Sequence, residues 1–213
     1  MSFWKLLISL SLSLLLFSTQ ATYAIQAPTQ PTLLVWGDSL SAAYGIPVEQ
    51  GWVKLLQAKL GSEFQVVNAS ISGETTSGGL ERLPAALAEI NPHYVLLELG
   101  ANDGLQGKPV NLIQDNLDKM IQQITQASAQ VILVGIHLPP NYGPSYTEKF
   151  DQVYQDLAKK YQLSFIPFLL EGVATDFNLM QADGLHPTAE AQTKILDHLW
   201  PSLEPVILKR VKP

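Results

Sequence analysis

The chain has 213 residues, of which 46% are hydrophobic and 15% charged, and this fits one compact domain with a substantial core. The formal net charge is −6, with no basic stripe outside residues 209–212, which argues against a nucleic-acid partner. The chain has no cysteine, which excludes a disulfide framework, a thiolate nucleophile, a cysteine-ligated metal and lipid attachment through cysteine.

The N-terminus has the pattern of a secretory signal peptide. A single Lys5 precedes a twelve-residue stretch of apolar residues and serines from Leu6 to Phe17, and small residues follow up to Ala24. This stretch is shorter than the ~20 residues that cross a bilayer, which favours cleavage near Ala24 over a retained anchor. We therefore expect residues 1–24 to be removed. The product would be periplasmic or secreted, with no stable transmembrane anchor.

Residues 25–31 contain two prolines and are predicted to form an extended linker. A single domain is predicted over residues 32–213, in which apolar runs of strand length alternate with segments of helical period. The predicted strands cover residues 32–36, 64–69, 94–99, 131–136 and 164–168. The predicted helices cover residues 51–60, 79–90, 110–128, 147–161 and 188–203.

The predicted strands are apolar on nearly every residue, which is typical of a parallel sheet covered by helices on both faces. The fold class is therefore α/β, a three-layer α/β/α sandwich with a flavodoxin-like sheet of five parallel strands. The strand order that we predict is 2-1-3-4-5. In such sheets, ligands bind beyond the carboxyl ends of the strands, near the switch point between strands one and three.

Polar residues and glycines follow three of these strand ends. Ser39 follows the first strand, Gly73 the second and Asn102 the third, so we expect all three at one edge of the sheet. Near the other end of the chain, Asp183 and His186 are three residues apart and can meet across one turn of backbone.

These residue types together suggest acyl transfer. A serine hydroxyl becomes nucleophilic when a base accepts its proton, and His186 can be that base while Asp183 fixes its tautomer. Negative charge then develops on the substrate oxygen, and the amides of Ser39 and Gly73 with the side chain of Asn102 are candidate oxyanion-hole donors. Taken singly, each residue is more simply a turn or cap residue, so the prediction depends on their joint occurrence at strand ends.

The other histidines do not form a cluster with metal-ligand spacing, and no metal site is predicted. His93 precedes the third strand and His198 lies in the last helix, and both are interpreted as surface residues. His137 follows the fourth strand on the same edge as Ser39. Two interpretations stay open for it, a surface position and a place in the lining of the cleft.

Three acidic residues lie beside the proposed site. Asp38 and Asp103 are interpreted as hydrogen-bond acceptors that fix their loops, not as acids in the reaction. Glu98 lies inside the third strand, so a buried carboxyl there needs a partner. The sequence does not identify that partner.

Four motifs resemble the characteristic blocks of the GDSL, or SGNH, hydrolases, and the likeness extends from residue 32 to the last helix. They are Gly37-Asp38-Ser39-Leu40-Ser41, Gly73, Gly100-Ala101-Asn102-Asp103 and Asp183-Gly184-Leu185-His186. The resemblance implies a three-layer α/β/α fold, no cofactor and hydrolysis of acyl esters and thioesters.

Longer spans are similar to the small exported bacterial enzymes of this family described as acyl-CoA thioesterase I, lysophospholipase and arylesterase. These spans are residues 73–84, 97–105 and 138–143. The resemblance implies small acyl ester or thioester substrates, lysophospholipid among them, and a mobile loop at 75–80 beside the acyl groove. The candidate substrate-binding residues are Thr75, Thr76, Ser77, Gly78, Gly79, Leu80, Leu138, Pro139 and Tyr142.

Two alternatives remain open at this point. One is a carbohydrate acetylesterase of the same superfamily, with a short open pocket. The other is a noncatalytic flavodoxin-like module that binds phosphate or flavin at the same edge, although the chain lacks a glycine-rich phosphate loop of the expected pattern. We expect a monomer. Acyl-chain preference cannot be read, because one methylene in an apolar pocket is worth only ~1–3 kcal/mol.

Overall fold

The computed structural model describes residues 30–208, and the predicted signal peptide and residues 25–29 of the predicted linker lie outside this range. One five-stranded sheet forms the centre, and every neighbouring pair in it is parallel. The order β2-β1-β3-β4-β5 confirms the predicted topology. The strands are β1 (Thr32–Gly37), β2 (Gln65–Asn68), β3 (Tyr94–Glu98), β4 (Gln130–Val134) and β5 (Ser164–Ile166).

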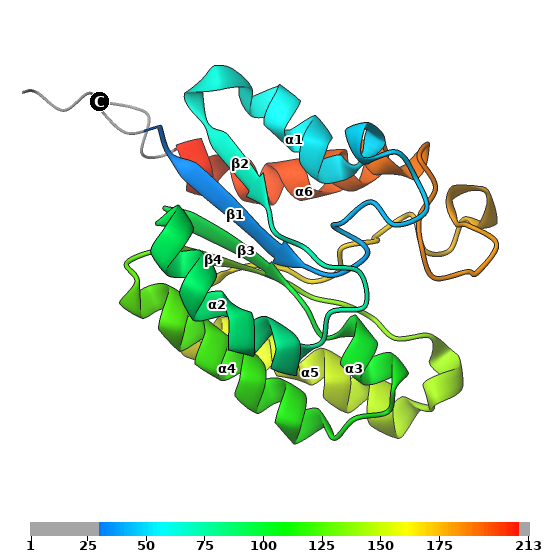
Figure 1. Ribbon diagram of the computed structural model, residues 1–213. Coiled ribbons are helices and arrows are strands. Elements are labelled where there is room, and N and C mark those ends of the chain that lie inside the picture. Colours follow the sequence, from blue (N-terminus) through cyan, green and yellow to red (C-terminus); the bar gives the residue numbers. More distant parts are fainter. Residues whose placement is uncertain (1–29, 209–213) are drawn as a thin grey trace, which may run out of the picture.

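Helices cover both faces of this sheet, which confirms the three-layer α/β/α sandwich (Figure 1). On one face lie α1 (Trp52–Leu60) and α6 (Ala191–Ile207), which contact each other. On the other lie α2 (Thr76–Ile90), α4 (Val110–Gln126) and α5 (Pro144–Tyr161). A short helix, α3 (Ala101–Leu105), follows β3, and 3₁₀ turns occur at Val48–Gln50, Gly61–Glu63, Pro140–Tyr142 and Phe177–Leu179.

Strand β1 shows how the sequence builds the two cores. Its side chains alternate between the faces: Leu33 and Val35 belong to the cluster with α1 and α6, and Leu34 and Trp36 to the cluster with α2, α4 and α5. All four are fully buried, and each contributes about 1.5–3 kcal/mol through burial. The register places Val35 beside Asn68 of β2 and beside Leu96 of β3.

The start of α2 differs from the sequence prediction. Residues 75–80 are predicted as a loop, but α2 begins at Thr76. The side chain of Thr75 caps the helix by accepting a hydrogen bond from the amide of Gly78, and Asp103 accepts bonds from the amide and hydroxyl of Thr76. Gly79 lets the helix pack closely, since a Cβ at this position would overlap with the side chain of Leu99.

The bounds of two other helices differ from the prediction by three or more residues, and α3 is not predicted from the sequence. Helix α5 starts at Pro144, three residues before the predicted start, because proline fits the first helical turn. Helix α6 begins at residue 191, not 188, and continues through Pro201 and Pro205. Proline removes a helix hydrogen bond, but the buried side chains of Leu203 and Ile207 keep this last part of α6 on the core.

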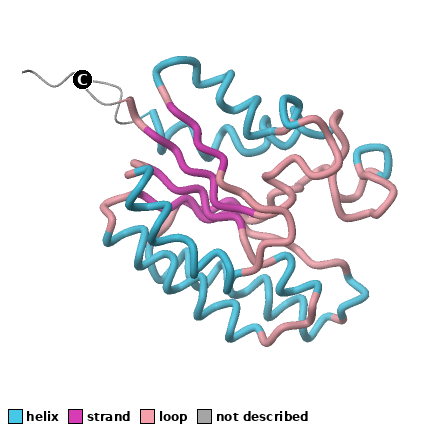
Figure 2. Tube along the Cα trace, in the orientation of Figure 1, coloured by secondary structure: helices cyan, strands magenta, loops and turns pink. Residues whose placement is uncertain are grey.

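The loops that follow the strands gather at the end of the sheet toward which the strands point (Figures 1 and 2). Parallel pairing places the ends of β1, β2 and β3 next to one another there, with β1 between the other two. Within residues 30–208, no helix is long and apolar enough to cross a membrane.

Candidate active site

Ser39 lies in the turn that follows β1. Asp38 fixes this turn, because its Oδ1 accepts a hydrogen bond from the amide of Leu40 at 3.0 Å. Its backbone carbonyl also accepts a bond from the amide of Ala42. The hydroxyl of Ser39 points out of this turn to His186, with 2.9 Å between Ser39 Oγ and His186 Nε2.

Asp183 and His186 form one hydrogen-bonded turn. Asp183 Oδ1 accepts bonds from the amides of Leu185 at 2.9 Å and His186 at 3.0 Å, and Gly184 supplies a positive φ of 66°. The other carboxylate oxygen, Oδ2, lies 2.7 Å from His186 Nδ1. The structure therefore brings together all three residues proposed from the sequence, although 147 positions separate Ser39 from His186.

Hydrogen bonds lower the pKa of Asp183 to about 2. Partial desolvation acts to raise this pKa, but the bonds from the backbone amide and ring of His186 and from the amide of Leu185 outweigh it. Asp183 is therefore ionised over the neutral range, and its Oδ2 is an acceptor for an Nδ1–H of His186. That arrangement leaves Nε2 as the ring nitrogen that can accept a proton from Ser39.

Tyr44 packs against His186, with 4.4 Å between the ring centroids and a tilt of 38°. Gln181 holds the tyrosine loop in place, since its side chain donates a hydrogen bond to the carbonyl of Tyr44. This contact is not predicted from the sequence. Tyr44 lies in a loop without periodicity, so only the three-dimensional structure shows that it faces the imidazole.

Asn102 is in the first turn of α3, beside the turn of Ser39. Its Nδ2 donates to the carbonyl of Glu74 at 2.9 Å and to Asp38 Oδ2 at 3.2 Å. Gly73 precedes Glu74 in the loop after β2 and has a φ of 80°. Within residues 30–208, the backbone N–H groups of Ser39 and Gly73 have no hydrogen-bond acceptor. The three proposed oxyanion donors thus lie in two neighbouring loops and the first turn of α3, at one edge of the sheet.

Two fully buried carboxyl groups lie behind Ser39. Glu98 Oε2 accepts a hydrogen bond from the hydroxyl of Ser41 at 2.6 Å and from the amide of Asp38 at 3.3 Å, so Ser41 is the partner that the sequence leaves unidentified. Burial raises the pKa of Asp38 to about 6, although the amide of Leu40 and His186 act to lower it. Burial and the charge of Asp38 also raise the pKa of Glu98 well above its usual range.

The two loop aspartates are hydrogen-bond acceptors, as predicted. Asp38 accepts bonds from Leu40 and Asn102, and Asp103 accepts bonds from Thr76. Both side chains therefore hold loops together at the carboxyl ends of β1 and β3.

A cleft of about 160 Å³ opens at the Ser39 hydroxyl. His137 lines it, in agreement with the second of its two interpretations, and so do Leu138 and Pro139 from the set of candidate binding residues. The lining does not include residues 75–80 or Tyr142, whose hydroxyl donates to the carbonyl of Leu105. The remaining lining residues are Ser39, Leu40, Ala101, Asn102, Leu105, Ile136, Phe168, Leu170, Leu185 and His186.

A family model described as the GDSL-like lipase/acylhydrolase family matches residues 35–194. The chain belongs to this family. The family suggested by the sequence motifs is thereby confirmed. Its members are described as lipases and acylhydrolases, which are enzymes that hydrolyse ester bonds.

Individual relatives support this assignment. The esterase TesA of Pseudomonas aeruginosa is 49% identical over 205 residues, which cover 95% of this chain and 98% of the relative. The thioesterase 1/protease 1/lysophospholipase L1 of Escherichia coli is 42% identical over 85% of this chain and 88% of its own. The solved psychrotrophic esterase EstA of a Pseudoalteromonas species, inhibited by monoethylphosphonate, has a TM-score of 0.79 and 43% identity over 83% of this chain and 98% of its own.

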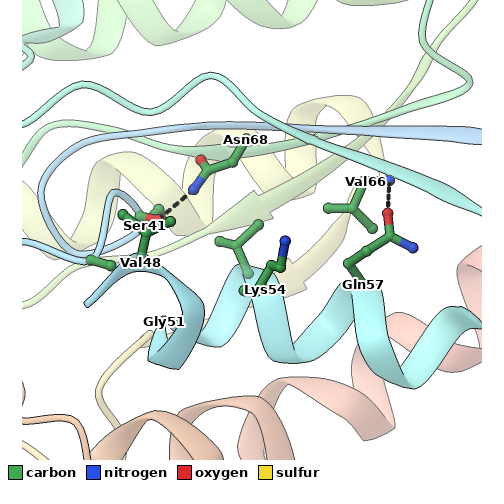
Figure 3. A pocket seen from close by; sticks show the side chains of 9 residues that line it. Ser41, Val48, Gly51, Lys54, Gln57, Val66 and Asn68 are labelled. Carbon is green, nitrogen blue, oxygen red and sulfur yellow. Dashed lines mark hydrogen bonds between the residues drawn. The ribbon is translucent and has the colours of Figure 1, made fainter. Parts of the chain in front are cut away.

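A second and larger cavity in this GDSL-family chain does not contain Ser39. It has a volume of about 310 Å³ and lies between α1 and β2, with Ser41, Lys54, Gln57 and Asn68 in its wall (Figure 3). Its polar side chains already have partners: Asn68 donates to the carbonyl of Ser41, Gln57 accepts from the amide of Val66, and Lys54 pairs with a glutamate. We therefore place the candidate active site at the smaller cleft.

The two histidines interpreted as surface residues are only partly exposed, and both are hydrogen-bonded. His93 Nδ1 accepts a bond from the amide of Thr32, and His198 Nε2 donates to the carbonyl of Phe168. The first bond ties the segment before β3 to β1, and the second ties α6 to the loop after β5. Residues 30–208 hold no group of three or more histidine and acidic side chains that could bind a metal ion.

Proposed function

We propose that this chain is a serine hydrolase that cleaves small acyl esters and thioesters through an acyl-enzyme. The observation that carries the proposal is the continuous line of contacts from Asp183 through His186 to Ser39, at 2.7 Å and 2.9 Å. A serine hydroxyl sealed in the core could not act as a nucleophile, but this one faces the cleft and an imidazole whose other nitrogen is held by a carboxylate.

The geometry supports a two-step reaction. Ser39 Oγ attacks the carbonyl carbon while His186 Nε2 takes the hydroxyl proton, and Asp183 stabilises the imidazolium that forms. The tetrahedral intermediate then expels the alcohol or thiol, which receives that proton from His186. A water molecule repeats the sequence on the acyl-enzyme, so that acid is released and Ser39 regains its proton.

The amides of Ser39 and Gly73 and Nδ2 of Asn102 are proposed to hold the oxyanion. Each donor of this kind contributes about 10²–10³ in rate. The Asn102 amide already donates to Glu74 and Asp38, and a substrate oxygen would share or replace the longer of these bonds, the 3.2 Å bond to Asp38. Asp38 therefore also keeps Asn102 oriented toward the site.

The cleft also supports an acyl substrate with apolar character. Beyond Ser39, Asn102 and His186, its wall consists of aliphatic, proline and phenylalanine side chains and His137. We propose acyl esters and thioesters as substrates, with aryl esters, acyl-CoA and lysophospholipid as the compounds to test. A carbohydrate acetylesterase remains the alternative activity on the same fold.

The test is active-site labelling. A fluorophosphonate probe should modify the wild-type chain at Ser39, as shown by peptide mapping, and should not modify Ser39→Ala. That variant should unfold at the same temperature as wild type and lose at least about 10³ of its kcat/KM for p-nitrophenyl esters. Labelling at another residue, or comparable turnover by the folded variant, would refute the proposed nucleophile.

Substrate class is tested with p-nitrophenyl esters of increasing chain length and with acyl-CoA thioesters. Activity that extends beyond acetate supports the proposed acyl hydrolase. Activity confined to acetyl esters, together with release of acetate from acetylated sugars, would favour the acetylesterase instead.

We further propose that residues 1–24 direct export and are then removed, so that the mature chain begins with the linker, at about residue 25. The support is the sequence pattern alone, since these residues lie outside the described range. Intact mass of the protein recovered from the cell exterior or periplasm would show cleavage near Ala24. Size-exclusion chromatography of the same sample tests the expected monomer.

A further inference from the structure

A second pair of histidine and aspartate lies at the same cleft. His137 follows β4 and lines the cleft, and Asp151 is on α5. The two side chains meet at 2.9 Å between His137 Nδ1 and Asp151 Oδ2. Phe168, which also lines the cleft, packs on the imidazole with 4.4 Å between ring centroids and a tilt of 51°.

These contacts fix the orientation of the imidazole. The carboxylate of Asp151 lies at ion-pair distance from Nδ1, and its negative charge favours a proton on that nitrogen. A ring with one proton then has Nε2 as its hydrogen-bond acceptor. Within residues 30–208, His137 Nε2 has no hydrogen-bond partner, and neither has the buried second oxygen of Asp151. Asp151 therefore has His137 as its partner, and the free edge of the ring is available to a ligand.

His137 lies among mostly apolar side chains of the cleft wall. The other polar side chains in the cleft wall are Ser39, Asn102 and His186, which belong to the proposed catalytic machinery. His137 is the only further polar side chain in that wall. One fixed polar group in an apolar pocket determines which substrates bind in a productive orientation. His137 is not a second base for Ser39, because the Ser39 hydroxyl already contacts His186.

We propose that His137 is a specificity-determining residue whose Nε2 accepts a hydrogen bond from a hydroxyl group of the substrate. Asp151 is the positioning residue that sets the tautomer, and Phe168 limits the rotation of the ring. The proposal rests on the proposed ester hydrolysis and names a substrate class for it, hydroxylated acyl esters. The hydroxyl can belong to the acyl chain or to the alcohol.

Two matched substrate series separate these sources. In the acyl series, p-nitrophenyl alkanoates are compared with the same esters carrying a hydroxyl at successive chain positions. In the alcohol series, ethyl esters are compared with 2-hydroxyethyl esters of the same acid. All assays are run at one pH, about pH 8. The quantity measured is the ratio of kcat/KM for the hydroxylated and plain members of each pair.

Wild type should favour the hydroxylated member of one series by about threefold to tenfold, the effect of one added hydrogen bond. His137→Leu should bring that ratio to one, while His137→Gln, which keeps an acceptor oxygen, should retain part of it. Asp151→Asn should lower the ratio, since the tautomer is no longer fixed. Asp118→Asn is the matched control: it removes a carboxylate that pairs with Lys160 and does not line the cleft, and the ratio should not change.

The results distinguish the two proposals. If no plain ester is hydrolysed by wild type, the proposed function itself fails. If plain esters are hydrolysed but the ratio is the same in wild type and His137→Leu for both series, the role of His137 is overturned. Thermal unfolding identifies variants that do not fold, and in that case His137→Gln and Asp151→Asn decide the question through the same ratio.

Discussion

Two aspartates near the Ser39 hydroxyl differ sharply in their surroundings. The side chain of Asp183 is 39% exposed and its pKa is lowered to about 2, whereas Asp38 is fully buried and its pKa is raised to about 6. Both interact with His186, the first by a hydrogen bond and the second through its charge. Two aspartates that interact with one imidazole thus have pKa values shifted in opposite directions.

The difference follows from the donors that each carboxylate meets. Asp183 receives two backbone N–H groups and the ring of His186, which stabilise its ionised form. Asp38 receives one backbone N–H and one side-chain amide, which do not compensate for its complete removal from water. Donor count and burial, more than distance from Ser39, separate an orienting carboxylate from a structural one.

Asp183→Asn should give the largest effect. The asparagine oxygen can still accept the two backbone bonds of the turn, but an amide cannot hold His186 Nδ1–H as a carboxylate does. We expect kcat/KM for p-nitrophenyl esters to fall by about 10³–10⁴ with little change in unfolding temperature.

The matched control for this variant is Asp176→Asn. Asp176 precedes Asp183 in the same region of the chain, and its carboxylate accepts a bond from the amide of Asn178, as Asp183 does from Leu185. Only Asp183 reaches the imidazole of His186. Asp176→Asn should therefore keep wild-type activity. Equal losses in the two variants would show that Asp183 acts only by shaping its loop.

Much of this site could be predicted from the sequence because its parts lie at the ends of apolar strands. Ser39, Gly73 and Asn102 each follow a strand, and the strand order brings those ends together. Asp183 and His186 are close in the chain, so their contact is local. Short-range spacing and strand topology were sufficient to predict that these residues lie close together.

Contacts between distant segments could not be predicted. The start of α2 depends on Asp103, which accepts bonds from Thr76, and a run of serine and glycines gives no helical signal of its own. The partner of Glu98 is Ser41, 57 positions away, and the partner of His137 is Asp151 on the next helix. Side-chain pairing of this kind depends on packing that the sequence pattern does not specify.

Asp38 and Asp183 should also differ in how their contributions to the unfolding free energy depend on pH. This effect is smaller than the loss of activity expected for Asp183→Asn. The pKa of Asp38 is raised from 3.8 to about 6, so its proton is bound more tightly in the folded state. That contribution is fully present below about pH 4 and is lost as pH rises through about 6. Wild type should therefore lose about 1–3 kcal/mol of unfolding free energy relative to Asp38→Asn between about pH 4 and pH 7.

Asp183 contributes in the opposite direction and in a different window. Its folded-state pKa is lowered, so its stabilisation is present above about pH 4 and is lost as pH falls toward 2. Wild type and Asp38→Asn both contain Asp183, so both should lose this stabilisation as the pH falls below about 4. Urea unfolding of wild type and Asp38→Asn across the pH range provides the measurement, and parallel curves above about pH 4 would contradict the raised pKa of Asp38.

The smallest effect is expected for Glu98→Gln at about pH 5, where a carboxyl with a strongly raised pKa carries its proton. Glutamine has nearly the same shape and is also neutral, and its oxygen can accept the bonds from Ser41 and Asp38 that Glu98 Oε2 accepts. Since Glu98 Oε1 has no partner within residues 30–208, the substituted NH₂ group loses no existing bond. The unfolding free energy should change by less than about 1 kcal/mol.

Glu98→Ala is the informative contrast, because it leaves the Ser41 hydroxyl and the Asp38 amide buried without an acceptor and should cost about 1–3 kcal/mol for each. A gain of several kcal/mol in Glu98→Gln at the same pH would instead mean that wild type buries an ionised Glu98 beside Asp38. In that case the interior behind Ser39 would carry a charge at this pH, and the contrast between an ionised Asp183 and a protonated interior would not hold.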